Sequence, residues 1–319
     1  MDWRLVGPQR EPAKDVDLST GDRRNGATRT DAVSPAVVDP RSDGVVRAGL
    51  VGRGIQGSRS PAMHQSEGKR IGLRYNYELL DFDILGLHEQ DLPAVIADAE
   101  RRGFSGLNVT HPFKQSVIGS LDDLSPEAAA IGAVNTVVLR DGKRIGHNTD
   151  SWGFAESIRR DMVDVPLGLV VQIGAGGAGM AVAQALMDLG AARLLIHDID
   201  RERADNLVAD LARRFGAGRA SLIDDLDTAI ASADGLVNAT PVGMAKYPGT
   251  PIPRKWLRRD LWVADIVYFP PETVLLATAR ARGARTLSGV GMAVYQAAMA
   301  FELFTGRPAD ADEMARHLG

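Results

Sequence analysis

Short apolar runs alternate with helical patterns along the second half of the chain. The runs predict buried strands at residues 169–173, 194–196, 236–238, 263–267 and 285–287, and helical periodicity appears over 180–189 and 201–215. Parallel strands need a long connection, which is usually a helix, so this order is typical of a parallel sheet covered by helices. A further helix, from Trp152 to about Asp161, precedes the first run. We therefore predict a doubly wound parallel sheet over residues 152–288.

The segment from residue 45 to residue 151 shows a similar alternation with a different ending. We predict strands at 46–51, 75–80 and 106–110, and helices at 61–72, 92–102 and 126–131, the first with Ser60 and the last with Ser125 as N-cap. Two further strands, 134–139 and 144–148, flank Asp141-Gly142, which is a hairpin signal. The pattern predicts an α/β domain separate from the parallel sheet.

The two ends of the chain differ in character. Residues 1–44 are rich in Arg, Asp, Pro, Ser, Thr and Gly and show no periodicity, so we predict a disordered tail, with an interaction arm as the alternative. Residues 292–305 carry a stripe of Met and Phe at helical spacing. We expect this helix, within a C-terminal helical segment 289–319, to pack back onto the first domain and complete its core.

Composition narrows the class of protein. The chain has 319 residues, 45% hydrophobic and 24% charged, and a net charge of −4, which gives no reason to expect a nucleic-acid partner. It lacks the roughly 20-residue apolar run of a membrane span and the apolar core of a signal peptide. It has no cysteine, and its six histidines show no metal-ligand spacing. We expect a cytoplasmic protein without a metal; the oligomeric state stays open, with a homodimer as one option.

A glycine-rich turn follows the strand predicted at 169–173. It runs Gly174-Ala175-Gly176-Gly177-Ala178-Gly179, and Gly174, Gly176 and Gly179 fall at the G-x-G-x-x-G spacing. In such a turn the first glycine permits a tight bend, the second lets the backbone approach a pyrophosphate, and the third lets helix and strand pack closely. The helix N-terminus offers unpaired N–H groups to the phosphates. With strand and helix on either side, the turn predicts a Rossmann-type dinucleotide-binding domain, against the alternative of a turn that binds nothing.

An acidic residue at the next strand end bears on which dinucleotide binds. Asp198 follows the strand at 194–196, at about the distance where a carboxylate meets the ribose 2′-OH. A carboxylate there favours NAD and repels the 2′-phosphate of NADP. Arg201 and Arg203 lie close by in the sequence, and either is able to meet a phosphate instead. NAD is the preferred prediction, with Arg203 in the candidate cofactor site.

Polar clusters stand at the strand ends of the first domain, where α/β proteins place ligand groups. They lie at residues 58–61, 108–114, 132–136 and 147–150 and supply hydroxyls, amides, an ammonium and a carboxylate. This set suits a small polyhydroxylated acid, and beside a nicotinamide the natural reaction is hydride transfer at a secondary alcohol. That step needs a group to take and return the hydroxyl proton. Lys114 is the best candidate, with Asp150 to hold its ammonium.

Seven motifs, in order, resemble those of the shikimate dehydrogenases and cover the chain from about Val46 to its end. They are Ser58-Arg-Ser-Pro-Ala-Met-His64, Asn108-Val-Thr-His-Pro-Phe-Lys114, Gly132-Ala-Val-Asn135-Thr, Asn148-Thr-Asp150, Asn238-Ala-Thr240-Pro-Val-Gly-Met244, Asp265-Ile-Val-Tyr268-Phe-Pro and Gly291-Met-Ala-Val-Tyr-Gln296-Ala. The resemblance implies reversible oxidation of shikimate to 3-dehydroshikimate, or of quinate to 3-dehydroquinate.

The resemblance also implies roles for single residues. Lys114 and Asp150 match the catalytic pair. The positions that match substrate-binding ones are Ser58, Ser60, Thr110, Asn135, Tyr268 and Gln296, with Asn108 as a weaker candidate. The positions that match the nicotinamide end of the cofactor site are Asn238, Thr240, Met244, Gly289 and Met292.

One motif departs from the biosynthetic members of the family. Those members carry Asn-Arg-Thr after the second strand of the cofactor domain, where the arginine meets the NADP 2′-phosphate, whereas this chain has His197-Asp198-Ile199-Asp200. The departure resembles the NAD-using quinate/shikimate dehydrogenases and agrees with the charge of Asp198. The alternatives are an NADP-dependent biosynthetic shikimate dehydrogenase and a dinucleotide-binding sensor of the same fold that performs no chemistry.

Several candidate residues also have simple structural interpretations. Asp150 alone is equally well explained as the N-cap of the helix from Trp152. Ser60 is able to cap a helix and face a substrate at once, and Tyr268 to pack a proline-rich loop. The sequence does not rank shikimate against quinate.

Overall fold

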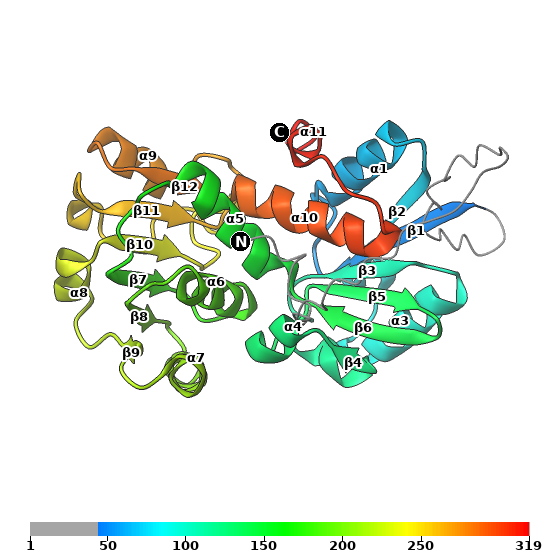
Figure 1. The fold of residues 1–319 in the computed structure, drawn as a ribbon, viewed down its shortest axis with the longest axis horizontal. Coiled ribbons are helices and arrows are strands. Elements are labelled where there is room, and N and C mark those ends of the chain that lie inside the picture. Colours follow the sequence, from blue (N-terminus) through cyan, green and yellow to red (C-terminus); the bar gives the residue numbers. More distant parts are fainter. Residues whose placement is uncertain (1–43, 319) are drawn as a thin grey trace, which may run out of the picture. The chain divides into compact units, whose positions relative to one another are not determined.

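The computed structural model describes residues 44–318, which belong to one compact unit, Val37–Gly319. The tail predicted over 1–44 lies outside the described residues except for its last one. Two six-stranded sheets and the helices around them make up the described chain (Figure 1).

The first sheet is mixed and has the strand order β2-β1-β3-β5-β6-β4. Its core is parallel, β1 pairing with β2 and β3, whereas β5 runs antiparallel to β3 and β6 and β4 joins the edge in parallel with β6. The predicted hairpin is confirmed, with Asp141 and Gly142 both at positive φ as its two-residue turn requires. The strands are β1 (Val45–Gly52), β2 (Arg74–Asp81), β3 (Gly106–Val109), β4 (Asp123–Leu124), β5 (Thr136–Arg140) and β6 (Lys143–His147).

The helices of this part are short, and one predicted cap is wrong. They are α1 (Ser60–Arg70), α2 (Phe82–Leu85), α3 (Leu92–Arg101) and α4 (Pro126–Ile131), with 3₁₀ turns at Glu89–Asp91 and Ser116–Ser120. Ser125 caps α4 as expected, accepting from the Ala128 amide. Ser60 is the first residue of α1 rather than its N-cap, which is Arg59. The helix begins one residue earlier than predicted, and the Ser60 amide donates to the Ser58 hydroxyl.

The second sheet is parallel throughout, in the order β12-β11-β10-β7-β8-β9, as the alternation of apolar runs and helices predicts. The turn from β7 into α6 lies at the middle of the sheet, where the strand order reverses. Its elements are β7 (Leu169–Ile173), α6 (Gly177–Asp188), β8 (Arg193–His197), α7 (Arg201–Phe215), β9 (Ala220–Leu222), α8 (Leu226–Ser232), β10 (Gly235–Asn238), a 3₁₀ turn (Arg254–Trp256), β11 (Trp262–Asp265), α9 (Val274–Ala281) and β12 (Thr286–Ser288).

Two long helices, α5 (Thr149–Asp161) and α10 (Gly289–Thr305), lie side by side and connect the two sheets (Figure 1). Helix α5 packs its Phe154 and Ile158 into the core of the parallel sheet. Helix α10 packs Ala300 and Phe304 against Leu50 and Val138 of the first sheet, so the final helix does complete that core.

The C-terminal segment 289–319 is not a single helix. Helix α10 ends at Gly306, whose φ of 69° closes the last turn in the left-handed region. Pro308 follows, and a second helix, α11 (Ala311–Ala315), packs Met314 against Met63 of α1. The end of the long helix predicted over 292–305 is therefore confirmed, whereas the rest of the expected helical segment 289–319 contains this break and a second, short helix.

One core residue is a histidine. His64 is fully buried in α1 among Tyr75, Tyr77 and Phe301. Its Nδ1 lies 3.1 Å from the Tyr75 hydroxyl, whereas its Nε2 has no partner among the described residues. Burial lowers the pKa of His64 from 6.5 to about 3, so the folded protein holds this ring neutral.

We predict that His64 makes the fold sensitive to acid. Between pH 6.5 and about 3 the unfolded chain binds a proton at this position and the native chain does not, so stability falls as the pH falls through this window. From pH 7 to pH 5 the loss due to His64 is about 2 kcal/mol. Urea unfolding at both pH values measures it. His64→Leu should lose less stability than the wild type over that interval, and an equal loss in both proteins would contradict the assignment.

Candidate active site

Lys114 and Asp150 meet at the ends of two neighbouring strands. Lys114 lies in the loop after β3, and Asp150 lies in the first turn of α5, just after β6. The Lys114 Nζ is 2.5 Å from the Asp150 Oδ2, and the two side chains are only 17% and 8% exposed. The N-terminal end of α5 further favours the negative charge of Asp150. The two residues predicted as a catalytic pair therefore form one largely enclosed ion pair.

Asp150 is not the cap of α5. Asn148 is the N-cap, and its Oδ1 accepts from the amides of Asp150 and Ser151. Its Nδ2 donates to the Ala133 carbonyl, which ties the start of the helix to the loop before β5. Capping by Asn148 leaves the Asp150 carboxylate available for Lys114, so the simple structural interpretation of Asp150 is wrong.

Ser58 lies in the loop between β1 and α1, and Ser60 is the first residue of α1; their hydroxyl oxygens are 3.2 Å apart. Tyr77 of β2 is a partner of these serines that sequence reasoning missed. Burial raises the pKa of the Tyr77 hydroxyl far above its usual range, and a hydrogen bond from Ser60 acts in the opposite direction. The same hydroxyl donates to Asn108 Oδ1 at 2.8 Å. The alternation along β2 places Tyr77 on a buried face, which is the only signal that the sequence offers for it.

A buried chain of amides and hydroxyls runs on from Asn108. Its Nδ2 donates to Thr136 Oγ1 at 3.1 Å, and that hydroxyl donates to Asn135 Oδ1 at 3.0 Å. Asn135 Oδ1 also accepts from the Thr149 amide at 2.7 Å, one residue before Asp150. Thr136 and Thr149 were not predicted as site residues. Asn135, a predicted substrate ligand, is thus bonded to the start of α5 within the protein.

The remaining predicted substrate residues surround the same strand ends. Thr110 follows β3 directly, and its methyl group lies 2.4 Å from where a side chain on Gly52 would begin, so only glycine fits at position 52. Gln296 of α10 lies against Gly153, one turn along α5 from Asp150. Tyr268, in the loop after β11, is 38% exposed, and burial of its hydroxyl, followed by the charge of Asp150, raises the pKa of that hydroxyl above its usual range.

The glycine turn before α6 has the geometry that its spacing predicts. Gly174 has a φ of 103°, and a Cβ there would lie 2.6 Å from the Ala239 carbonyl oxygen. A Cβ on Gly179 would lie 2.4 Å from the Gly174 oxygen, so the third glycine is needed for close packing. A Cβ on Gly176 would meet nothing within 4 Å, and α6 has no side-chain cap. Open space beside uncapped N–H groups fits a pyrophosphate.

Asp198 contacts the glycine turn itself. Its Oδ2 accepts from the Ala175 amide at 2.6 Å, and its Oδ1 accepts from the Asp200 amide at 2.9 Å. Arg203 lies 3.8 Å from Asp198 and 3.2 Å from Asp200, which caps α7. A cavity of about 310 Å³ opens beside this cluster, and its lining includes Ala175, Asp200, Glu202, Arg203 and Asp210.

The residues expected near the nicotinamide lie in two segments, the loop after β10 and the start of α10. Asn238 and Thr240 are bonded to each other, and Asn238 Nδ2 also donates to Asp265 Oδ1, which fixes the loop after β10. Met244 in that loop is 40% exposed. Gly289 begins α10 against the Ile266 carbonyl, where a Cβ would lie 2.2 Å away, and Met292 is buried in the core of the parallel sheet.

The glycine turn before α6 touches the loop that carries Lys114. A Cβ on Gly177 would lie 3.4 Å from both Cβ and Cδ of Lys114, and Gln115 Nε2 lies 3.5 Å from Met180 Sδ. The lysine stem therefore packs on the first residue of α6. This contact brings the lysine that is predicted to transfer a proton beside the turn that is predicted to bind a dinucleotide.

Over residues 44–318 no cluster of three or more His, Asp or Glu side chains is placed to hold a metal ion. Within the same range no helix is both long and apolar enough to cross a membrane.

A Rossmann-type sheet with an enclosed lysine–carboxylate pair beside its glycine turn defines a dinucleotide-dependent oxidoreductase. Comparison with known proteins identifies the family within this class. A family model for the shikimate dehydrogenase substrate binding domain matches residues 50–137, and one for the shikimate 5′-dehydrogenase C-terminal domain matches residues 289–318. The chain belongs to the shikimate dehydrogenase family, whose members are NAD(P)-dependent oxidoreductases acting on a CH–OH group.

Some relatives are named with NADP and others with NAD. The chain is 53% identical to a shikimate dehydrogenase (NADP(+)) of Streptomyces avermitilis, over 83% of this chain and 92% of that protein. It is 45% identical to a quinate/shikimate dehydrogenase (NAD(+)) of Corynebacterium efficiens, over 83% and 95% of the two chains. The quinate dehydrogenase of Corynebacterium glutamicum in complex with NAD has a similar structure, with a TM-score of 0.81, 43% identity and coverage of 86% and 98%.

Proposed function

We propose that the chain interconverts shikimate and 3-dehydroshikimate, or quinate and 3-dehydroquinate, with NAD as the hydride carrier. In this proposal residues 45–151, completed by the segment 289–319, bind the substrate, and residues 152–288 bind the dinucleotide. The observation that carries it is the Lys114–Asp150 ion pair, whose lysine packs on the cofactor turn. Relatives with these substrates in their names support the substrate class.

The chemistry follows from the state of the ion pair. In the reduction direction the Lys114 ammonium, held by Asp150, gives a proton to the carbonyl oxygen as that oxygen becomes negative. In the oxidation direction the neutral amine takes the proton of the hydroxyl while the carbon gives up its hydride and the C=O bond forms. The dinucleotide, when bound, supplies the nicotinamide ring that accepts or returns this hydride. Asp150 keeps the lysine in place throughout.

The surrounding residues bind and orient the substrate. The hydroxyls of Ser58, Ser60 and Thr110 and the amide of Gln296 are groups that pair with a carboxylate and ring hydroxyls. We assign Tyr268 to the same site because the charge of Asp150 contributes, after burial, to raising the pKa of its hydroxyl. Asn135 acts through the start of α5, since its Oδ1 accepts from the Thr149 amide.

The preference for NAD rests on the charges around Arg203. This guanidinium lies within 4 Å of two carboxylates, on Asp198 and Asp200, so its charge is already compensated. Three carboxylates, on Asp200, Glu202 and Asp210, line the adjoining cavity beside this single arginine. A 2′-phosphate placed there meets net negative charge, whereas a ribose hydroxyl meets acceptors. Dependence on NADP is the alternative, favoured by the name of the Streptomyces relative.

Steady-state kinetics with both substrates and both dinucleotides test the proposal. We expect kcat/KM for NAD to exceed that for NADP by at least about tenfold, since one unfavourable charge contact costs about 1.4 kcal/mol. Asp200→Asn retains the helix cap but removes one of the two carboxylates beside Arg203. The ratio of kcat/KM for NADP to kcat/KM for NAD should therefore rise several-fold. Asp205→Asn is the matched control, because Asp205 lies on the same helix and pairs with Arg201. A wild-type preference for NADP would overturn the assignment.

Lys114→Ala separates an enzyme from a binding sensor. We expect the variant to bind NAD like the wild type, because the glycine turn is unchanged, while turnover falls by roughly 10²–10⁴-fold with the loss of general acid–base catalysis. Fluorescence titration of NADH measures the first and product formation the second. Unchanged turnover would remove Lys114 from the mechanism.

A further inference from the structure

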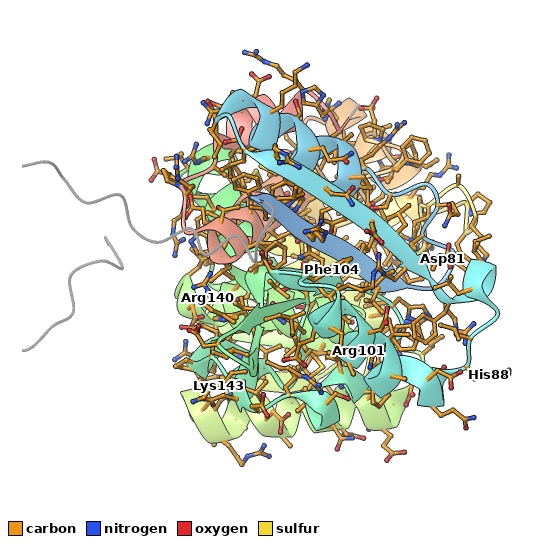
Figure 2. All side chains as sticks on the ribbon, turned by 90° about the vertical axis from the view of Figure 1, so that its right-hand side faces the viewer. Asp81, His88, Arg101, Phe104, Arg140 and Lys143 are labelled. Carbon is orange, nitrogen blue, oxygen red and sulfur yellow. The ribbon has the colours of Figure 1, made fainter. Side chains whose placement is uncertain are left out.

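Strand β2 ends in a buried carboxylate that the proposed chemistry does not use. Asp81 is 1% exposed and is the last residue of β2, where the chain turns into the short helix α2 (Figure 2). Parallel pairing places it opposite Gly52, the last residue of β1. The loop that leaves β1 at this point carries Ser58 and leads into α1, whose first residue is Ser60.

Four donors converge on this carboxylate. Oδ1 accepts from the Gly54 amide at 3.0 Å and from the Asp83 amide at 3.1 Å. Oδ2 accepts from the Ile55 amide at 3.0 Å and from Gln56 Nε2 at 2.9 Å. Burial acts to raise the pKa of Asp81, but these hydrogen bonds together hold it below its usual range.

Capping of α2 explains only one of these contacts. The Asp83 amide belongs to α2, which has four residues, and one oxygen lone pair is enough to cap it. The other three donors come from consecutive residues of the loop after β1, namely Gly54, Ile55 and Gln56. The charge of Asp81 is thus used mainly to hold that loop.

The held segment leads directly to the two serines. The Ile55 carbonyl accepts from the Ser58 amide at 2.9 Å, which closes a turn. The Ser58 hydroxyl lies 3.2 Å from the Ser60 hydroxyl and accepts from the Ser60 amide. Asp81 is therefore linked to both hydroxyls through Ile55, whose amide it binds, and through the turn that Ile55 forms with Ser58.

We propose that Asp81 is a positioning residue for the substrate site, which sets the loop of Ser58 and Ser60 in its binding conformation. The inference rests on the proposed function, in which these serines hold the substrate. Asp81 itself touches no reacting atom.

Asp81→Asn tests the inference, because the asparagine side chain is nearly the same size as the aspartate side chain that it replaces. An amide has one acceptor oxygen, so about half of the donors lose their acceptor and the loop loosens. We expect KM for the better substrate, shikimate or quinate, to rise about tenfold or more, with kcat within about threefold and KM for NAD unchanged. Hydrogen exchange at the Gly54 and Ile55 amides of the free protein should become faster.

Asp83→Asn is the matched control. Asp83 carries the same charge at the same corner, but its carboxylate pairs with Arg53 in a largely exposed ion pair and does not bond to the loop amides. It should leave KM and amide exchange close to those of the wild type. Gln56→Ala, which removes a single donor, should shift KM in the same direction as Asp81→Asn by a smaller factor, and it serves if Asp81→Asn folds poorly.

The possible failures are distinguishable. An active wild type whose KM and amide exchange are unchanged in Asp81→Asn would overturn the inference, as would an equal effect of Asp83→Asn. A wild type inactive on both substrates would refute the proposed function and the substrate role of the serines. In that event, faster exchange confined to Asp81→Asn still supports the loop-positioning part.

Discussion

The close crossing of α5 and α10 is the constraint on which the arrangement of the site depends. A Cβ on Gly153 would lie 2.8 Å from the Met292 carbonyl, and one on Gly291 would lie 2.6 Å from the Ser157 hydroxyl, so the helices touch backbone to backbone. Helix α5 carries Asp150 in its first turn, and α10 carries Gln296. Because α10 also packs on the first sheet and α5 on the second, a larger residue at either glycine would push the two helices apart and shift Asp150 relative to the first sheet.

A second principle recurs at the strand ends. A polar side chain at or just after the end of a strand turns back and accepts hydrogen bonds from the loop that follows it or its neighbour. Asp81 does this for the serine loop, Asn148 for α5, Asp198 for the glycine turn and Asn238 for the loop after β10. Such groups bring order to loops that must present ligands without regular secondary structure. Asp150, at the start of α5, and the glycine turn, two parts of the candidate site, are held in this way.

The sequence predicted the parallel sheet, the hairpin and the packing of α10 well, because each rests on a strong local signal. Periodicity marked the strands, Asp141-Gly142 marked the turn, and the Met and Phe stripe marked a core face. It missed β9 and α9, since a three-residue strand and an eight-residue helix that follows two prolines give little periodic signal.

The sequence predicted which residues belong to the candidate site better than it predicted the contacts between them. Lys114 and Asp150 came from motifs, and the structure adds that they form one pair and that Asn148 caps the helix. Tyr77 and Asp81 stand in no motif, because their importance lies in hydrogen bonds between segments far apart in the chain; Thr136 ends a quoted motif, but its bonds to Asn108 and Asn135 were not predictable. Asp198 was expected to meet the ribose, and its contact with the Ala175 amide depends on how the turn folds back.

The central claim is that the Lys114 amine moves the proton of the substrate hydroxyl, and chemical rescue tests it most directly. In the Lys114→Ala variant, with substrate and NAD saturating, small primary amines can enter the space left by the side chain. The account predicts that turnover rises in proportion to the concentration of free amine and that the wild type does not respond. A Lys114→Ala variant that binds both ligands and yet shows the same rate at every amine concentration would contradict it.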